Sequence, residues 1–423
     1  MTPLVDGRRL ASNGEFPIEE YYLPLNEAEI EKVMKRIKTG ITYNPMISTT
    51  SISILAEGTI IWYDHHEDGY EADVLDPSSS STEIWGDGNC DNGHAPDTCA
   101  DTGKPDEIGA GTVFTLENPV NIISYTRDNN WDGLSPDYLY DSSDRLLASF
   151  PVAITRSIRP GAAGSPGGQI AGGTEVLNTD NYGTEFIAPV GVTGTSNSGE
   201  SFELTEFHVM GSSSGTEIIY TNSSCSDGCN ATIERGASFR IENVRVGDYV
   251  TSTNNRPVQV HLITGNVGST YELRWFSMLP TSQWDKTYYT PVGYNDVYAF
   301  IYNPNDDSEI TVTWVRGGAC DDTELDNSRR CTNSFLVGIK SSYRVRLYDT
   351  WPAGVMTGYK FYSDNVFFGV IRVDDSVLYD WGHTLIPENQ LSSQVLISKL
   401  HTAEHLYCDF TPTAAVPHHL CSS

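Results

Sequence analysis

A threefold repeat of strand-like segments and paired cysteines is the feature of this sequence that most constrains its fold. Apolar and polar residues alternate in segments that begin at Ser51, Phe207 and Tyr298, and a polar loop with two cysteines follows each segment. The next strand-like stretch is alike in the first two copies, Ala110-Gly-Thr-Val-Phe-Thr-Leu-Glu-Asn and Arg235-Gly-Ala-Ser-Phe-Arg-Ile-Glu-Asn. Alternation with a period of two indicates strands with one buried face, so each copy is predicted to start with a β-hairpin.

This repeat predicts an all-β chain of tandem immunoglobulin-like β-sandwich units with one short N-terminal helix. The helix is expected to begin after Asn26, a residue that caps helices well, and to end before Gly40. Its early glutamates and late basic residues suit the helix dipole. The predicted organisation is an N-terminal segment with the helix, three sandwich units of which the first has an acidic insertion, and a disulfide-clipped C-terminal tail, at residues 1–43, 44–186, 187–287, 288–395 and 396–423.

The eight cysteines fall into four close pairs in polar, turn-rich loops. Because no Cys-x-x-Cys is present, disulfides are favoured over a zinc site. The expected pairs are Cys90–Cys99, Cys225–Cys229, Cys320–Cys331 and Cys408–Cys421. Two glycosylation sequons, at Asn222 and Asn230, flank the second pair. These features predict an extracellular or cell-surface protein, whose signal peptide would be absent from this numbering.

The charge of the chain argues against polyanionic partners. With 26 basic and 56 acidic residues, the formal net charge is -30. A nucleic acid or an anionic lipid surface needs a basic patch, so neither is expected as a partner. No run of about 18 apolar residues is present, and no membrane span is expected. Like chains of this charge would repel one another unless cations bridged them.

One loop of the acidic insertion has the spacing of calcium ligands. Oxygen-bearing side chains alternate at Asp87, Asn89 and Asp91, and Asp97 follows. The match is partial, since Thr98 stands where a calcium loop needs a bidentate glutamate. The four oxygen-bearing residues are the predicted metal ligands, with calcium as the candidate cofactor. A solvated acidic loop without an ion is the alternative.

Two adjacent histidines, His65 and His66, lie upstream in the segment Asp64-His-His-Glu-Asp-Gly-Tyr-Glu. Imidazoles and carboxylates together are typical ligands of transition metals. Successive side chains of a strand point to opposite faces, so the two histidines are not expected to bind one ion together. A polar turn after a strand is the favoured interpretation.

No motif singles out a catalytic reaction. The Gly-x-Ser-x-Gly at residues 211–215 lies in a predicted hairpin and is not a strand-to-helix elbow. The sequence contains no phosphate-binding glycine loop and no His-Glu-x-x-His, and no carboxylate pair stands out. The chain is therefore expected not to be an enzyme, with a secreted glycosidase or metal-dependent hydrolase as the more distant alternative. A carbohydrate-binding, lectin-like module is the nearer alternative, because four aromatic residues could stack on sugars: Trp85, Trp131, Tyr138 and Tyr140.

Two segments, Ile61-Trp-Tyr-Asp-His-His-Glu-Asp-Gly-Tyr-Glu and Thr82-Glu-Ile-Trp-Gly-Asp-Gly-Asn, resemble a signature of large, uncharacterised secreted surface proteins of bacteria and algae. In that signature a tryptophan stands at the position of His66. The architecture is also similar to the N-terminal region of IgGFc-binding proteins, which are secreted adhesion proteins. The resemblance implies a surface or matrix module with no catalytic residue to carry over.

The predicted function is therefore that of an extracellular structural or adhesive surface protein. We expect it to self-associate into a filament or matrix that disulfides and calcium stabilise. Its expected partners are further copies of the chain, other extracellular matrix or surface proteins, and glycans.

Overall fold

A computed structural model of the chain describes residues 18–40, 42–78, 81–96, 98–99, 104–122, 140–161, 172–192, 202–268, 273–290, 296–317, 331–347, 358–374 and 381–391. It also describes the backbone of four short strands, β1 (Leu4–Val5), β2 (Arg8–Arg9), β27 (Tyr407–Asp409) and β28 (Leu420–Ser422). Strands dominate this part of the chain, and its one α-helix is α1 (Glu27–Ile37). The prediction of an all-β chain with one short N-terminal helix is confirmed.

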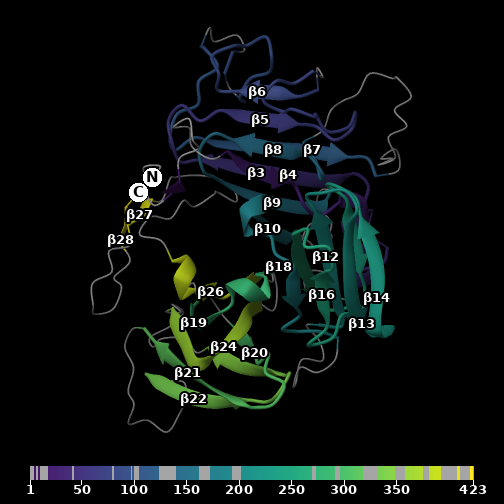
Figure 1. Cartoon of the computed structure of the whole chain (residues 1–423), viewed down its shortest axis with the longest axis vertical. Coiled ribbons are helices and arrows are strands. Elements are labelled where there is room, and N and C mark those ends of the chain that lie inside the picture. The colour runs from purple at the N-terminus through teal and green to yellow at the C-terminus, as the bar shows by residue number, and fades with distance from the viewer. Residues whose placement is uncertain are drawn as a thin grey trace.

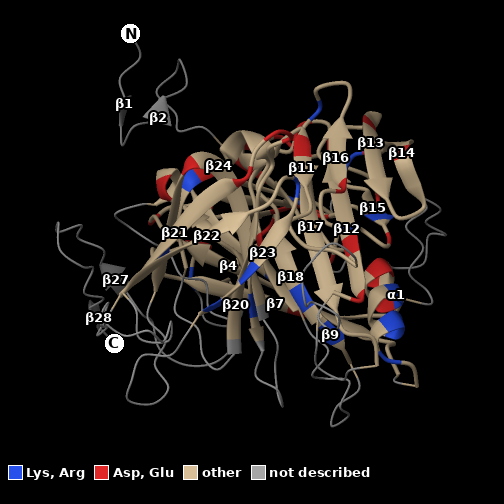
Figure 2. Ribbon diagram, turned by 90° about the horizontal axis from the view of Figure 1, so that it is seen from below, with Lys and Arg blue, Asp and Glu red and all other residues tan. Residues whose placement is uncertain are grey.

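The helix α1 begins and ends where its sequence predicts. The Asn26 side chain accepts hydrogen bonds from the backbone N–H groups of Ala28, at 3.0 Å, and Glu29, at 3.2 Å. These bonds satisfy donors that a helix start otherwise leaves without partners. The buried face of α1 includes the apolar residues Ile30, Val33, Met34 and Ile37. Charges of both signs lie on its exposed face (Figure 2).

The same antiparallel strand order occurs in three consecutive copies, each of two sheets (Figure 1). In the first copy the sheets read β10 (Gly172–Val176), β9 (Val152–Pro160), β4 (Met46–Ile54), β7 (Val113–Val120) and β3 (Glu19–Tyr22), β8 (Arg145–Ala148), β5 (Ile61–Asp64), β6 (Glu83–Trp85). In the second they read β18 (Leu273–Ser277), β17 (Val258–Gly265), β12 (Leu204–Gly211), β15 (Ser238–Ile241) and β11 (Glu185–Ile187), β16 (Tyr249–Ser252), β13 (Thr216–Asn222), β14 (Cys225–Ile233).

In the third copy one long strand, β24 (Tyr359–Asp374), takes part in both sheets. Its sheets read β25 (Trp381–Thr384), β24, β20 (Asp296–Tyr302), β23 (Ser342–Leu347) and β26 (Ile386–Pro387), β19 (Asp285–Tyr289), β24, β21 (Ile310–Arg316), β22 (Thr332–Val337). Short 3-10 turns follow the last strands of the copies, at η2 (Thr179–Asn181), η3 (Thr281–Gln283) and η4 (Glu388–Gln390). The first strand of each copy begins earlier than the unit boundaries predicted at residues 44, 187 and 288. Strand β3 lies before the first of these boundaries, and β11 and β19 cross the other two.

Each of the three predicted hairpins is instead an arch, in which two successive strands belong to opposite sheets and do not pair. The hairpin prediction is therefore wrong. The strands β4 and β5, β12 and β13, and β20 and β21 follow one another in the chain but pair with other strands. An arch and a hairpin show the same alternation, because both place one face of each strand in a core. The partners of β4 are β7 and β9, which local sequence does not specify.

Among the described residues, three clusters of buried side chains form cores within and between the copies. One lies between the sheets of the first copy and includes Ile52, Tyr63 and Trp85. A second runs through the second and third copies. A third joins α1 to both the first and second copies, through residues such as Ile158 of β9 and Ile263 of β17. The copies therefore share buried surfaces, and the chain is not a row of independent units.

Edge strands of all three copies meet where the sheets converge, since β18 contacts both β10 and β25. The contact is close enough to require glycine at position 172, because a Cβ there would lie 1.8 Å from Cε2 of Trp275. The sheets are thus arranged in a propeller-like ring (Figure 1). The finer expectation, a series of immunoglobulin-like sandwiches, is not clearly reproduced.

Candidate metal centre

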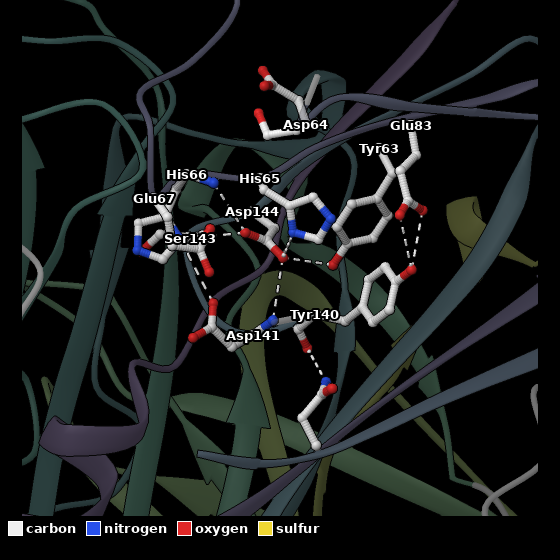
Figure 3. Close-up of polar contacts among 12 residues, drawn as sticks. Tyr63, Asp64, His65, His66, Glu67, Glu83, Tyr140, Asp141, Ser143 and Asp144 are labelled. Carbon is white, nitrogen blue, oxygen red and sulfur yellow. Dashed lines mark hydrogen bonds and ion pairs between the residues drawn. The ribbon is translucent and has the colours of Figure 1, made fainter. Parts of the chain in front are cut away.

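A polar cluster lies at the end of the first copy where β5 and β8 run side by side. The two strands are antiparallel, and Asp64, the last residue of β5, is opposite Arg145, the first residue of β8. The turn that follows β5 therefore meets the segment that precedes β8. This pairing brings His65, His66 and Glu67 to Asp141 and Asp144 (Figure 3).

Both histidines approach the same carboxylate, so the expectation that they point apart is wrong. The Nδ1 atom of His65 lies 3.6 Å from Oδ2 of Asp144, and Nδ1 of His66 lies 3.3 Å from Oδ1. The strand ends at Asp64, and the alternation of strand side chains does not apply to the turn beyond it.

Three carboxylates surround the His66 ring nitrogen. Its Nδ1 atom lies 3.3 Å from Asp144 Oδ1, 3.5 Å from Glu67 Oε2 and 3.6 Å from Asp141 Oδ1. The ligand atoms of His66, Asp141 and Asp144 all lie within 4.8 Å of one another, and so do those of His65, Glu67 and Asp144. Nitrogen and carboxylate ligands at these separations could hold a metal ion.

Asp144 is the shared centre of both groups and is fully buried. Its Oδ2 atom accepts hydrogen bonds from the Tyr63 hydroxyl, at 2.8 Å, and from the Asp141 N–H, at 3.1 Å. Burial acts to raise the pKa of Asp144, but hydrogen bonds with His65 and His66 outweigh it and lower the pKa to about 2. Burial acts to lower the pKa of His65, yet Asp144 raises it to about 9. These two residues thus form a buried ion pair.

Asp141 is also fully buried, and no described residue donates a hydrogen bond to either of its carboxylate oxygens. Burial, together with the nearby carboxylates of Glu27, Asp144 and Glu67, raises the pKa of Asp141 well above its usual value. Burial and Asp144 raise the pKa of Glu67 as well. Neither Asp141 nor Asp144 was predicted as a site residue from the sequence. Their only local signal is an acidic pair just before a strand.

An aromatic wall covers one side of the cluster. The Tyr63 ring stacks on Trp85 with centroids 5.3 Å apart and meets Tyr140 edge-on at 5.0 Å. Trp85 is fully buried, and Tyr140 donates a hydrogen bond of 3.0 Å to Glu83. Trp85 is therefore a core residue, and the prediction that it stacks on sugars is wrong. Trp131 and Tyr138 lie outside the described residues.

The predicted calcium loop uses its side-chain oxygens in its own turns. Asp87 accepts hydrogen bonds from the Asn89 N–H and the Asn92 side chain, both at 2.8 Å, and Asn89 accepts one from the Asp91 N–H at 3.1 Å. Asp97 lies outside the described residues. None of these residues belongs to the two ligand groups found in the described part of the chain. Calcium at this loop stays a prediction.

A buried carboxylate organises the loop instead. Asp106 accepts hydrogen bonds from the backbone N–H of Gly86, from the N–H of Ala95 at 2.9 Å and from the Thr98 hydroxyl at 2.8 Å. Its own backbone carbonyl accepts a hydrogen bond of 2.8 Å from Gly88 N–H. A carboxylate with several such donors can order a loop without an ion.

Two of the predicted disulfides lie in the described residues. Cys90 is bonded to Cys99 and Cys225 to Cys229, with Cα atoms 5.7 Å and 6.0 Å apart. Cys331 is disulfide-bonded too. Its predicted partner, Cys320, and the side chains of Cys408 and Cys421 lie outside the described residues.

The two sequon asparagines lie on neighbouring strands of the second copy. Asn230 is exposed on the edge strand β14. Asn222 is half-buried on β13, and its side-chain amide donates a hydrogen bond of 3.0 Å to the Glu242 carbonyl. Exposure makes Asn230 the more accessible of the two predicted glycosylation sites.

No family model matches the chain, and comparisons with curated proteins and with solved structures find no match either. The resemblance to secreted surface proteins and to IgGFc-binding proteins therefore stays a prediction. Among the described residues, no helix is long and apolar enough to cross a membrane.

Proposed function

We propose that the chain is an extracellular structural or adhesive protein. The observation that carries this proposal is the pair of disulfides, Cys90–Cys99 and Cys225–Cys229, in a chain made mostly of strands. Disulfides persist in oxidising compartments and are rare in the cytosol, where thiols stay reduced. The first bond constrains a polar loop and the second a polar part of the edge strand β14, and both segments have little apolar core of their own.

The proposal includes tandem β-sandwich units of immunoglobulin-like type. The strand order that recurs in three consecutive pairs of sheets supports it. In the first unit, residues of both sheets contribute to one buried cluster, as the two layers of a sandwich do. The buried surfaces between units would make such an array stiff, which suits a structural part.

The outer face of the third copy offers a surface for self-association. Leu336 on the edge strand β22 is 57% exposed, and Val315 on β21 and Tyr362 on β24 are 39% and 40% exposed. Strand pairing places all three side chains on the same outward face. An exposed edge strand with an apolar face can pair with a second chain.

Replacing Leu336 with lysine is expected to reduce assembly of the chain without changing its thermal stability. A charge on an edge strand opposes pairing with a second copy, and an exposed side chain contributes little to the core. Sedimentation and electron microscopy of the purified protein would measure the assemblies. Val267→Lys is the matched control, because Val267 is 51% exposed but lies in the second copy. A wild-type protein that stays monomeric at all concentrations would contradict self-association.

The extracellular location is tested by labelling intact cells that produce the protein with an antibody against the chain. Labelling of intact cells is the expected result. Labelling only after the cells are permeabilised would reject the proposal.

A further inference from the structure

We propose that His66, Glu67, Asp141 and Asp144 bind one divalent zinc-type metal ion and that this ion locks the first copy at the end of β5 and β8. The site goes beyond the proposed function, and either proposal can fail without the other. It also differs from the predicted calcium loop, which uses different residues.

The spacing of the carboxylates around His66 suits the proposed ion. Zinc bound at about 2.0–2.1 Å by four tetrahedral ligands keeps those ligands about 3.3 Å apart. The distances from His66 Nδ1 to the three carboxylate oxygens are 3.3, 3.5 and 3.6 Å. The ligand atoms of His66, Asp141 and Asp144 lie within 4.8 Å of one another, whereas Glu67 groups with His65 and Asp144 and would have to turn toward Asp141 when the ion binds.

The environment of Asp141 is independent evidence for a bound cation. Its carboxylate is fully buried, points toward His66 and accepts no hydrogen bond from any described residue. Burying a carboxylate without hydrogen bonds is costly, so side chains in this state usually pair with a charge or coordinate a metal. A bound cation would give this buried carboxylate a positive partner, through the Oδ1 atom that faces His66.

The donor atoms decide which class of ion fits. Calcium and magnesium take oxygen ligands, whereas zinc and cobalt accept an imidazole nitrogen together with carboxylates. The set here is one imidazole and three carboxylates, which favours a transition-metal ion. Three carboxylates also bring enough negative charge to the site to attract a divalent cation.

Residues around the cluster would hold the ligands in place. Asp144 Oδ2 faces the His65 ring and accepts a hydrogen bond from the Tyr63 hydroxyl, and Oδ1 is directed at His66. Partners of this kind orient metal ligands and raise affinity. The side chains of His66 and Glu67 are 10% and 19% exposed, so an ion can enter from their side. Four protein ligands complete the coordination of zinc, as in structural sites.

The test uses the full chain after its metals have been removed with a chelator. Cobalt titration followed by visible absorption is expected to show one tetrahedral Co²⁺ per chain, and zinc is expected to displace it. Asp141→Asn keeps the shape of the side chain but removes a charged ligand, and we expect it to weaken zinc binding by about 100-fold or more. His65→Gln, which alters a residue that positions Asp144, is expected to weaken binding by about 10–100-fold.

His94→Gln is the matched control, because its side chain is exposed in the neighbouring disulfide loop. It is expected to bind zinc like the wild type. Circular dichroism would show whether each variant folds. If Asp141→Asn does not fold, Glu67→Gln, which changes a partly exposed ligand, takes its place. Less than one bound ion per chain, or unchanged zinc affinity in the folded ligand variant, would overturn the proposal.

Discussion

Replacing Arg156 with methionine is expected to lower the free energy of unfolding by about 3–5 kcal/mol, the usual cost of breaking a buried ion pair. The side chains of Arg156, on β9, and Glu27, in the first turn of α1, are both 0% exposed and form an ion pair. The Arg156 guanidinium also donates a hydrogen bond of 2.8 Å to the Thr50 hydroxyl.

The size of this effect follows from what the substitution leaves behind. Glu27 would stay buried at the start of α1 without a cation, although its second oxygen accepts a hydrogen bond of 2.6 Å from the Ser142 hydroxyl. The pair also connects α1 to the sheet of β9, which contributes to the cluster shared by the first two copies. Loss of the pair should therefore loosen the packing of α1.

Chemical denaturation of the wild type and the variant measures the change. Arg159→Met is the matched control on the same strand, because Arg159 pairs with Glu117 at 3.4 Å where both side chains are more than 40% exposed. An exposed pair contributes about 0–1 kcal/mol, so the control should stay close to the wild type. Combining Arg156→Met with Glu27→Gln should restore part of the stability, since no buried charge then lacks a partner. Equal losses for Arg156→Met and Arg159→Met would contradict this account.

The two buried histidines His208 and His261 are expected to lower the stability of the protein in mild acid. They lie opposite each other on β12 and β17 and are 2% and 1% exposed. Burial lowers the pKa of both to about 3, and the charge of Arg240 contributes for His208. An unfolded chain holds histidines with a pKa of about 6.5.

The direction of the pH effect follows from these values. Between a pH of about 6.5 and 3 the unfolded chain binds protons that the folded chain excludes, so stability is present at neutral pH and lost as the pH falls. Each histidine contributes up to about 1.4 kcal/mol per pH unit. Glu206, beside His208, acts in the opposite direction, because burial raises its pKa to about 7 and its contribution is lost as the pH rises.

A histidine variant separates these effects. The difference in unfolding free energy between the wild type and His261→Gln is expected to change by about 2 kcal/mol between pH 6.5 and pH 5. Urea unfolding at a series of pH values measures it. The exposed His94→Gln is the control and should follow the wild type at every pH. A constant difference between wild type and His261→Gln across this range would show that His261 is not the titrating group.

Features that depend on neighbours in sequence could be predicted well. Asn26 caps α1 by accepting bonds from residues two and three places later. The described disulfides join cysteines only 9 and 4 residues apart. The alternation likewise predicted strands, although β12 and β17 are buried on both faces and not on one. All three depend on contacts within a few residues, and the local pattern contains the information.

Features that depend on strand pairing could not be predicted. The alternation of β4 and β5 is the same for a hairpin and for an arch, so the hairpin interpretation was as consistent with the sequence as the arch. Trp85 was considered for sugar stacking, and its strand, β6, has only three residues. It is buried because β6 pairs with β5, which places its ring on Tyr63.

The sequence by itself determined that this chain forms strands and one short helix, with disulfides between cysteines close in sequence, because these properties arise from local alternation, capping and spacing. Only the tertiary structure decided that His66 and Glu67 meet Asp141 and Asp144. These two segments are more than 70 residues apart, and they come together because β5 pairs with β8 in one register. Sheet partners are chosen by the packing of whole faces, and a local sequence pattern cannot specify them.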